Sequence, residues 1–421
     1  MRGPSGLFTN VASMLTVRVT RQVLTLVTLP YLTRVLGAEG FGLVAIATAV
    51  AAFHQIVVEY AFDLSSSRAI ARVREHGDEV RRIVANTLSA KALALLAATV
   101  VILPVGLAIP SLRDHPALFV GALAFSASQA LSFGWYFQGL ERLERLARIE
   151  ILARIGAAAS LFLFIRDAEA YWLVPWVQSV PLALGLVIMA FTAARWHGLA
   201  IAGLGRGLAT LRDTWRMFAF KSSSALYKGA NTILLSLVVD PATVGLFAAA
   251  DKLVRSAVDL VNPVAQVMLP RQSQLVVRDR PAAERLARRT LFLLTGGAAI
   301  GAAGLVWLRE PLLRLVFGAG FTDAAAVLMA LALLIPFGAA SNVVGVQWMV
   351  PLGMDRAFLR IVVLVGLANL VAAPIAAITA GAVGVAWTSV AGEAAVVTTM
   401  LVVLTRAGAN PFRPMRGTSA A

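Results

Sequence analysis

Long apolar segments recur along the whole chain and leave few ways for it to fold. Crossing about 30 Å of hydrocarbon at 1.5 Å per residue takes roughly 20 residues, and twelve segments reach or approach that length. They span residues 10–32, 41–64, 82–108, 116–139, 149–166, 171–193, 214–238, 242–268, 290–308, 326–350, 357–378 and 382–405. Because 59% of the 421 residues are hydrophobic and only 14% are charged, one water-soluble core could not bury them. The sequence therefore predicts an all-α polytopic membrane protein with about twelve transmembrane helices.

The chain also contains an internal repeat. The dipeptide Gly42-Leu43 recurs as Gly245-Leu246, and the same shift superimposes Arg18 on Lys221. Repeated sets of apolar helices are typical of transporters whose halves move about a central site. We therefore expect two pseudo-symmetric six-helix bundles around a central cationic cavity. The predicted parts are an N-terminal bundle at 1–193, a cytoplasmic linker at 194–213 and a C-terminal bundle at 214–421.

The arginines indicate how the chain is oriented. Most of them fall in loops on the side of the N-terminus, and the loops on the opposite side hold only Arg34, Arg113, Arg166, Arg309 and Arg314. Because cytoplasmic loops retain positive charge during insertion, both termini are predicted to be cytoplasmic. The net charge of +15 is spread over these loops and forms no single basic face, so we expect the lipid bilayer and no nucleic acid as a partner.

Neither a metal site nor a catalytic site is expected. The chain has no cysteine, and its four histidines show no ligand spacing. The longest outward loop, around 309–325, contains no histidine and no paired carboxylates of the kind that acid-base catalysis uses. We therefore predict no metal, no cofactor and no enzymatic activity.

Ionisable residues inside the predicted spans point to a functional cavity, because each costs several kcal/mol unless it meets water or a partner. The basic ones are Arg18, Arg21, Lys91, Arg154, Lys221, Lys228, Lys252 and Arg255. The acidic ones are Glu59, Asp63, Asp251, Asp259 and Glu393. The basic residues outnumber the acidic ones by three, so an anionic ligand would improve the charge balance.

Six of the basic residues are candidates for binding an anionic head group. They are Arg18, Arg21, Lys221, Lys228, Lys252 and Arg255. Arg18 and Lys221 are equivalent in the repeat, so a two-fold arrangement would bring them to the central cleft from opposite sides. Guanidinium forks and ammonium point charges both suit phosphate oxygens. Lys91 and Arg154 lie within about three helical turns of a cytoplasmic end, and we expect both to snorkel to the interface.

All five acidic residues are candidates for energy coupling or counter-charge. Glu59 and Asp63 lie at a depth comparable to that of Arg18 and Arg21, and pairing with these arginines is as probable as a role in transport. Glu393 stands alone in the last span, either as a proton-coupling acid or as the counter-charge of a lysine.

One group of charges has a local explanation. Asp251, Arg255 and Asp259 follow one another at i, i+4 and i+8, which predicts an intrahelical ladder of ion pairs. Lys252 belongs to the same cluster but is not part of this ladder.

Four segments carry a resemblance to a known family. Residues 29–43 (LPYLTRVLGAEGFGL), 67–71 (SRAIA), 240–250 and 269–271 (LPR) resemble the corresponding parts of Wzx-type polysaccharide flippases, which belong to the multidrug/oligosaccharidyl-lipid/polysaccharide (MOP) exporter superfamily with its MATE-like fold. The resemblance implies a bacterial inner-membrane protein that flips a polyprenyl-diphosphate-linked oligosaccharide, such as an O-antigen unit, to the outer leaflet by alternating access. It also implies the polysaccharide polymerase machinery as a partner. Candidate sugar contacts are Trp135, Tyr136, Gln138, Asn231, Asn342 and Gln347.

Three other functions remain open at this point. A lipid II-type flippase would carry a similar diphosphate lipid. A MATE-like exporter of organic cations would share the fold but should favour acids in its cavity, and a membrane polysaccharide polymerase would need a larger outer loop. Proton antiport, membrane potential and substrate mass action are all compatible with Glu393 and a basic cavity.

Overall fold

A computed structural model of the protein describes residues 4–411, with the side chains of 4–15, 220, 223–228 and 259–267 left out of the description. The helices within residues 4–236 are α1 (Pro4–Glu59), α2 (Phe62–Val73), α3 (Gly77–Leu107), α4 (Pro110–Arg113), α5 (Pro116–Ala130), α6 (Gly134–Gly139), α7 (Leu143–Phe164), the 3-10 helix η1 (Ala168–Leu173), α8 (Val174–His197) and α9 (Leu204–Ser236). The others are α10 (Pro241–Arg278), α11 (Arg280–Trp307), α12 (Arg309–Phe317), the 3-10 helix η2 (Ala319–Ala324), α13 (Ala325–Ala332), α14 (Leu334–Ser341), the π-helix η3 (Asn342–Met349) and α15 (Asp355–Arg406). Residues 4–411 contain no β-strand, so the predicted all-α class is confirmed.

The predicted membrane spans correspond to these helices. Seven helical stretches of the described chain are long and apolar enough to cross a bilayer, namely Thr16–Val73, Gly77–Leu107, Pro116–Gly139, Ala168–His197, Arg280–Trp307, Ala319–Met349 and Asp355–Arg406. Two of them hold two predicted spans each and are broken between these, at Gly37 in α1 and at Ala380 and Gly381 in α15. Helices α7, α9 and α10 contain 22, 33 and 38 residues and are also long enough to span. The chain is a multi-pass membrane protein.

Gly37 allows the first of these breaks. Its φ of 68° and ψ of −176° lie in a region that only glycine populates readily, because a Cβ would clash with the local backbone. A Cβ built there meets no other atom within 4 Å, so the requirement is for backbone freedom and not for space. The chain turns at this point from the first span into the second.

Replacing Gly37 by alanine should therefore cost about 1–3 kcal/mol of stability through backbone strain alone. Thermal unfolding of the purified protein in detergent would measure this cost. The matched control is Gly296→Ala in α11, where the glycine is helical and a Cβ also meets nothing within 4 Å. A Gly37→Ala protein as stable as this control would show that the break does not depend on glycine.

The contacts divide the chain into a first unit, Met1–Gly245, and a second unit, Leu246–Ala421. The division falls within α10, whereas the sequence predicts a linker at 194–213. The observed division and the predicted linker differ because α9 packs along α1 and α3 and so belongs to the first unit. The arrangement of two six-helix bundles around a central cavity stays a prediction.

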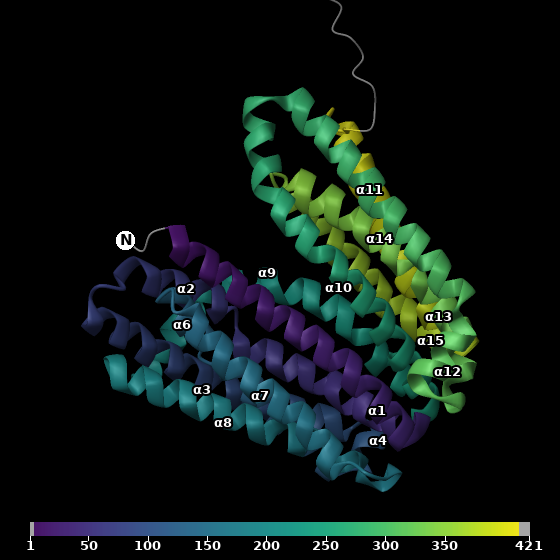
Figure 1. Cartoon of the computed structure of the whole chain (residues 1–421), viewed down its shortest axis with the longest axis horizontal. Coiled ribbons are helices and arrows are strands. Elements are labelled where there is room, and N and C mark those ends of the chain that lie inside the picture. The colour runs from purple at the N-terminus through teal and green to yellow at the C-terminus, as the bar shows by residue number, and fades with distance from the viewer. Residues whose placement is uncertain (1–3, 412–421) are drawn as a thin grey trace, which may run out of the picture. The chain divides into compact units, whose positions relative to one another are not determined.

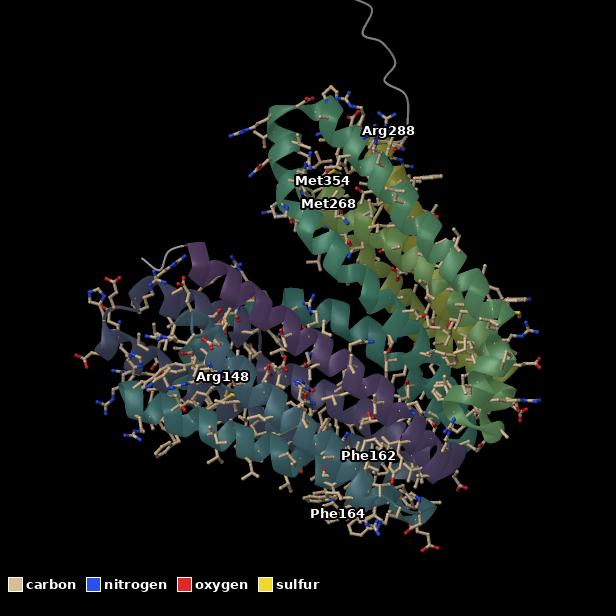
Figure 2. The ribbon with its side chains drawn as sticks, in the orientation of Figure 1. Arg148, Phe162, Phe164, Met268, Arg288 and Met354 are labelled. Atoms are coloured by element: carbon tan, nitrogen blue, oxygen red, sulfur yellow. The ribbon has the colours of Figure 1, made fainter. Side chains whose placement is uncertain are left out.

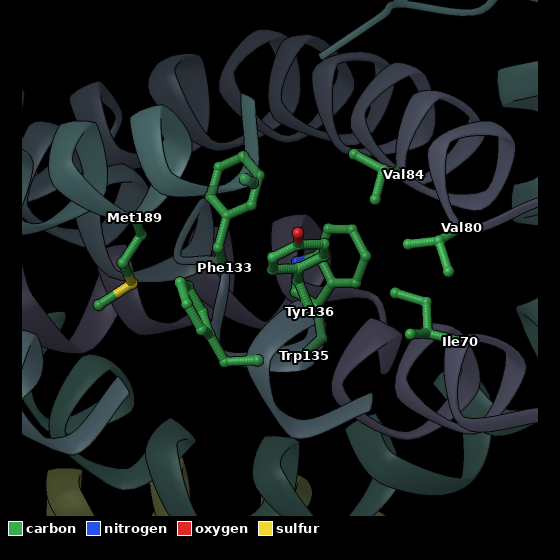
Figure 3. Packing of buried hydrophobic residues seen from close by; sticks show 9 residues of the cluster. Ile70, Val80, Val84, Phe133, Trp135, Tyr136 and Met189 are labelled. Atoms are coloured by element: carbon green, nitrogen blue, oxygen red, sulfur yellow. The ribbon is translucent and has the colours of Figure 1, made fainter. Parts of the chain in front are cut away.

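In the first unit, α1 contacts α3, α5, α7 and α9, and α8 packs against α5 and α7 (Figure 1). An aromatic run near the break between α5 and α6 fills one end of its core. Phe133, Trp135 and Tyr136 are each at most 4% exposed, and they lie with Ile70 and Met189 in one cluster (Figure 3). This packing fixes the position of α6 against α2.

The outer surface of the first unit is apolar, as a lipid-facing surface must be. On α7, Leu152 and Phe164 are 70% and 61% exposed. Figure 2 shows Phe162 and Phe164 at one end of α7 and Arg148 toward the other. Apolar side chains exposed in this number would be an aggregation hazard in water, but they are normal against acyl chains.

In the second unit, α11, α13, α14, η3 and α15 pack together. Trp348, on η3, is fully buried and donates a hydrogen bond from its Nε1 to the carbonyl oxygen of Ala409 at 2.9 Å. The Arg280 guanidinium lies 4.8 Å from the centre of its ring. Trp348 thus ties the end of the chain that follows α15 to the start of α11.

Candidate substrate site

A cavity of about 280 Å³ lies among the helices of the first unit. Six ionisable side chains line it, namely Arg21, Glu59, Asp63, Lys91, Glu150 and Arg154. Its neutral polar lining includes Gln55, Ser128, Gln129, Ser132, Trp135 and Gln138. Helices α1, α2, α3, α6 and α7 all contribute, so the cavity exists only when these helices are packed together. Charged and amide groups enclosed by membrane helices are the features that mark a pathway for a polar substrate.

A cluster of three charges lies at one side of this cavity. The Lys221 ammonium on α9 is 3.3 Å from Glu59 Oε2 and 3.0 Å from Asp63 Oδ1. Gln55 Nε2 donates a further hydrogen bond to Glu59 Oε1 at 2.8 Å. Glu59 and Asp63 do act as counter-charges, but the cation that these ion pairs involve is Lys221, because α9 packs beside α1. The side chain of Lys221 is 36% exposed, so water can reach the cluster.

Lys91 lies deeper in the first unit than the sequence predicts. Its side chain is 3% exposed, and its Nζ donates hydrogen bonds to the carbonyl oxygens of Ala130 and Ser132. These carbonyls are available because the chain breaks between α5 and α6. The expectation that Lys91 snorkels to the interface is wrong, since the broken helix offers it acceptors inside the bundle.

Arg154 lines the cavity together with Glu150, one turn earlier on α7. Arg154 Nη2 is 3.6 Å from Glu150 Oε1, and the two side chains are 19% and 26% exposed. Arg154 Nε is buried and has no hydrogen-bond partner among the described residues. The same is true of Trp135 Nε1. Within the described part of the chain, two buried N–H donors on residues that line the cavity thus lack an acceptor.

Of the predicted anion-binding residues, Arg21 lines the cavity and Lys221 lies beside it. Arg18 is exposed on α1, one turn before Arg21. The side chain of Lys228 lies outside the described residues. Glu393 is half-buried in the last part of α15. The binding roles of all these residues stay predictions.

The charges of α10 behave as the local pattern predicts where they are described. Arg255 Nε donates to Asp251 Oδ2 at 2.6 Å, which confirms this step of the intrahelical ladder. The side chain of Asp259 lies outside the described residues. The side chain of Lys252 is exposed, and its binding role also stays a prediction.

The candidate sugar contacts lie in four places. Trp135 and Gln138 line the cavity. Tyr136 is fully buried, and its hydroxyl is hydrogen-bonded to His197 Nδ1 at 2.7 Å. Asn231 lies on α9, and Asn342 and Gln347 lie on η3.

Sequence reasoning did not identify Lys91, Glu150, Arg154 and Gln129 as lining residues. The spacing of Glu150 and Arg154 at i and i+4 is visible in the sequence, and it indicates an ion pair but not the cavity that the pair faces. The cavity depends on which helices are neighbours.

Comparisons of the whole fold find known transporters. The lipid II flippase MurJ in an inward closed conformation superimposes with a TM-score of 0.74, covering 94% of this chain and 87% of MurJ at 14% sequence identity. A multidrug resistance MATE family transporter of the MOP superfamily in an inward-facing conformation superimposes with a TM-score of 0.70, covering 97% of this chain and all of that transporter at 16% identity. At such low identities the likeness concerns the fold alone.

Sequence comparisons find nearer relatives. A protein of Escherichia coli (strain K12) named "Putative O-antigen transporter" is 28% identical over 373 residues, which are 86% of this chain and 88% of the relative. A protein of the same name from Shigella dysenteriae is 26% identical over 351 residues, with 82% and 86% covered. The sequence profile of the family described as "Polysaccharide biosynthesis protein" matches residues 7–276, more than half of the chain and including every residue that lines the cavity. The chain therefore belongs to this family of polysaccharide biosynthesis proteins.

Proposed function

We propose that the protein flips a polyprenyl-diphosphate-linked oligosaccharide from the cytoplasmic to the outer leaflet of the bacterial inner membrane. The observation that carries this proposal is the cavity of the first unit, where six ionisable side chains and several amides lie among membrane-spanning helices. The similarity to two proteins named as O-antigen transporters supports the same substrate class. The protein acts as a transporter and not as an enzyme, with both termini in the cytoplasm.

The physical task explains why such a cavity is needed. Moving even one unpaired charge from water into hydrocarbon costs tens of kcal/mol in the idealised limit, and a diphosphate carries more than one. A hydrated passage with polar walls removes most of this cost for the head group. The polyprenyl tail stays in the acyl region, where its transfer costs nothing comparable.

The basic residues of the spans supply the diphosphate site in this proposal. Arg21 faces the cavity, and its guanidinium can bind phosphate oxygens in a fork. Lys221 reaches the same region from α9. Arg18, Lys228, Lys252 and Arg255 complete the set.

Flipping is tested with purified protein in liposomes that contain a fluorescent polyprenyl diphosphate oligosaccharide. A reagent that quenches only the outer leaflet reports how fast the lipid crosses. We expect Arg21→Gln to slow flipping at least about tenfold, the loss of one charge-assisted hydrogen bond. Arg314→Gln is the matched control, because Arg314 is an exposed arginine of α12 outside the cavity.

Two results would contradict the proposal. Wild-type protein that leaves the lipid in its original leaflet would remove the flippase function. In cells, deletion of the gene should trap a lipid-linked glycan on the cytoplasmic leaflet. A deletion strain that changes only in its sensitivity to organic cations would favour the exporter.

A further inference from the structure

A group of exposed arginines lies around Trp196, where α7 begins and α8 ends. We infer that this group binds the phosphate of an anionic phospholipid of the bilayer, with Arg142 and Arg145 as the ligands and Arg195 as a neighbouring cation. Such a lipid is a bound companion of the protein and not its cargo, so its site goes beyond the proposed flipping.

Trp196 is a fixed base for two of these arginines. Helices α7 and α8 lie side by side and are joined by the short segment 165–173, so the start of α7 is next to the end of α8 (Figure 1). The guanidinium carbons of Arg145 and Arg142 lie 5.0 Å and 5.8 Å from the centre of the Trp196 ring. The same ring is 5.9 Å, centre to centre, from that of the fully buried Phe137. Trp196 therefore packs against the core and holds both arginines at the surface.

Stacking leaves both guanidinium groups able to bind phosphate. A stacked guanidinium keeps its N–H donors in its own plane, where two of them can meet two phosphate oxygens. Within the described residues, Arg142, Arg145 and Arg195 form no ion pair with a carboxylate. The Arg195 guanidinium lies 5.7 Å from the centre of the Phe191 ring, and all three arginines are exposed.

The acidic residues next to these arginines in the sequence are already paired. Glu141 Oε1 lies 2.7 Å from Arg74 Nη1, and Glu144 pairs with Arg148 one turn later on α7. The two pairs are neutral, so a head group at Trp196 meets a net positive charge. Phosphatidylglycerol brings a phosphate and no cation, which complements this charge, whereas the cation of a zwitterionic head group would add repulsion.

The surface of α8 beside Arg195 suits acyl chains. Leu184, Ile188 and Phe191 are 59%, 53% and 62% exposed, and they follow one another at i, i+4 and i+7. Arg195 comes one turn after Phe191 on the same stripe. A phospholipid can therefore lay its chains along the stripe while its phosphate meets the arginines, which a free phosphate cannot do. In the proposed topology this end of α8 lies at the cytoplasmic leaflet, where anionic lipids attract basic residues.

The arginines around Trp196 are separate from the cavity of the first unit. Helix α7 contributes Leu146 and Glu150 to the described lining of the cavity. Arg145 lies on another side of this helix, two turns before Leu152, which is 70% exposed. The proposed lipid site therefore faces the bilayer and not the cavity.

Native mass spectrometry of the full-length protein in detergent tests this site by counting bound lipids. The probes are phosphatidylglycerol, phosphatidylcholine with the same acyl chains, and a polyprenyl diphosphate without sugar. We expect the wild type to bind one phosphatidylglycerol at least about tenfold more tightly than phosphatidylcholine, the value of a charge-assisted hydrogen bond. Arg142→Gln/Arg145→Gln should lose this advantage and leave the affinities for phosphatidylcholine and the polyprenyl diphosphate unchanged. Glycerol 3-phosphate, which has no acyl chain, should not displace phosphatidylglycerol.

Two further double variants separate a built site from overall charge. Glu144→Gln/Arg148→Gln removes an exposed arginine of the same helix together with its acid, so the net charge and the binding of phosphatidylglycerol should not change. Arg142→Lys/Arg145→Lys keeps both charges but loses the planar fork, so its affinity should fall between those of the glutamine variant and the wild type. All these side chains are exposed, and thermal unfolding without added lipid should be the same for every variant.

Several results would overturn the site. Equal affinity of the wild type for both phospholipids is one, and unchanged phosphatidylglycerol binding in Arg142→Gln/Arg145→Gln is another. Wild-type affinity in the lysine variant would mean that only overall charge matters. Displacement by glycerol 3-phosphate would assign the arginines to a free phosphate, and a tenfold loss of polyprenyl diphosphate binding in the glutamine variant would assign them to the substrate lipid. None of these results depends on flipping, which the liposome assay measures separately.

Discussion

Replacement of Gly42 by alanine should destabilise the protein by about 3 kcal/mol, a large loss for a single methyl group. A Cβ on Gly42 would lie 1.7 Å from the carbonyl oxygen of Pro241 and 2.9 Å from the backbone nitrogen of Gly245. Both of these atoms belong to the first turn of α10, which cannot rotate away as a side chain could. The two backbones would have to separate by more than about 1 Å to reach van der Waals distance.

Replacement of Gly245 by alanine should destabilise the protein for the same reason. A Cβ on Gly245 would lie 2.0 Å from the carbonyl oxygen of Ala38 and 3.1 Å from the nitrogen of Gly42. One separation of the two helices would relieve both contacts. We therefore expect the double variant Gly42→Ala/Gly245→Ala to lose little more stability than the worse single variant, a clear departure from additivity.

Thermal unfolding in detergent and the yield of monodisperse protein measure these losses. The control is Gly301→Ala in α11, a helical glycine where a Cβ meets nothing within 4 Å. This control should be neutral or slightly stabilising, because alanine is the better helix former. Single variants as stable as the control would show that α1 and α10 are not packed this closely.

The same pair of glycines shows what the sequence predicts well. Gly42 and Gly245 stand out in the sequence because they are equivalent in the repeat, and in the structure they lie against each other. The membrane spans are equally predictable from the sequence, because the length of an apolar segment decides whether it can cross the membrane. Even the break at Gly37 falls in the gap between two predicted spans. These features depend on local composition, which the sequence states directly.

Neighbour relations between helices are what the sequence leaves open. The sequence predicts 214–238 as the first span of the second half, yet α9, which contains most of this span, packs on α1 and α3. Lys221 therefore meets Glu59 and Asp63, residues far away in the sequence. The position of Arg154 at the cavity is likewise not predictable from the sequence, because it depends on how the helices pack. Apolar helix faces are much alike, so hydropathy does not say which of them meet.

Replacement of Lys221 by methionine should reduce flipping at least about tenfold and leave the protein folded. The change leaves Glu59 and Asp63 without their cation, but the three side chains are 33–49% exposed. Water and the nearby cations of the cavity then reduce the penalty, so the loss of stability should stay within about 1 kcal/mol. In the proposed function, the lost activity reflects a missing phosphate ligand.

A charge-neutral variant distinguishes this role from a structural one. Glu59→Gln/Asp63→Asn/Lys221→Met removes both acids together with the lysine, so no unpaired charge remains in the cluster. If Lys221 served only to neutralise the two carboxylates, flipping should return to the wild-type rate. We expect the triple variant to remain inactive, because hydrogen bonds among neutral groups do not replace an ammonium group facing a diphosphate.

Lys221→Arg completes this series, because it keeps the positive charge and changes only the geometry. The guanidinium can still reach Glu59 and Asp63, so we expect partial flipping, between the rates of Lys221→Met and the wild type. Rates measured in the liposome assay for all three variants decide the matter. Recovery of flipping in the triple variant would show that Lys221 has only a structural role in the first unit. Arg21 would then be the cation of the cavity that binds the substrate. Continued inactivity with intact folding would instead mean that transport needs the ammonium group of Lys221 itself, and not only its neutralisation of the two carboxylates.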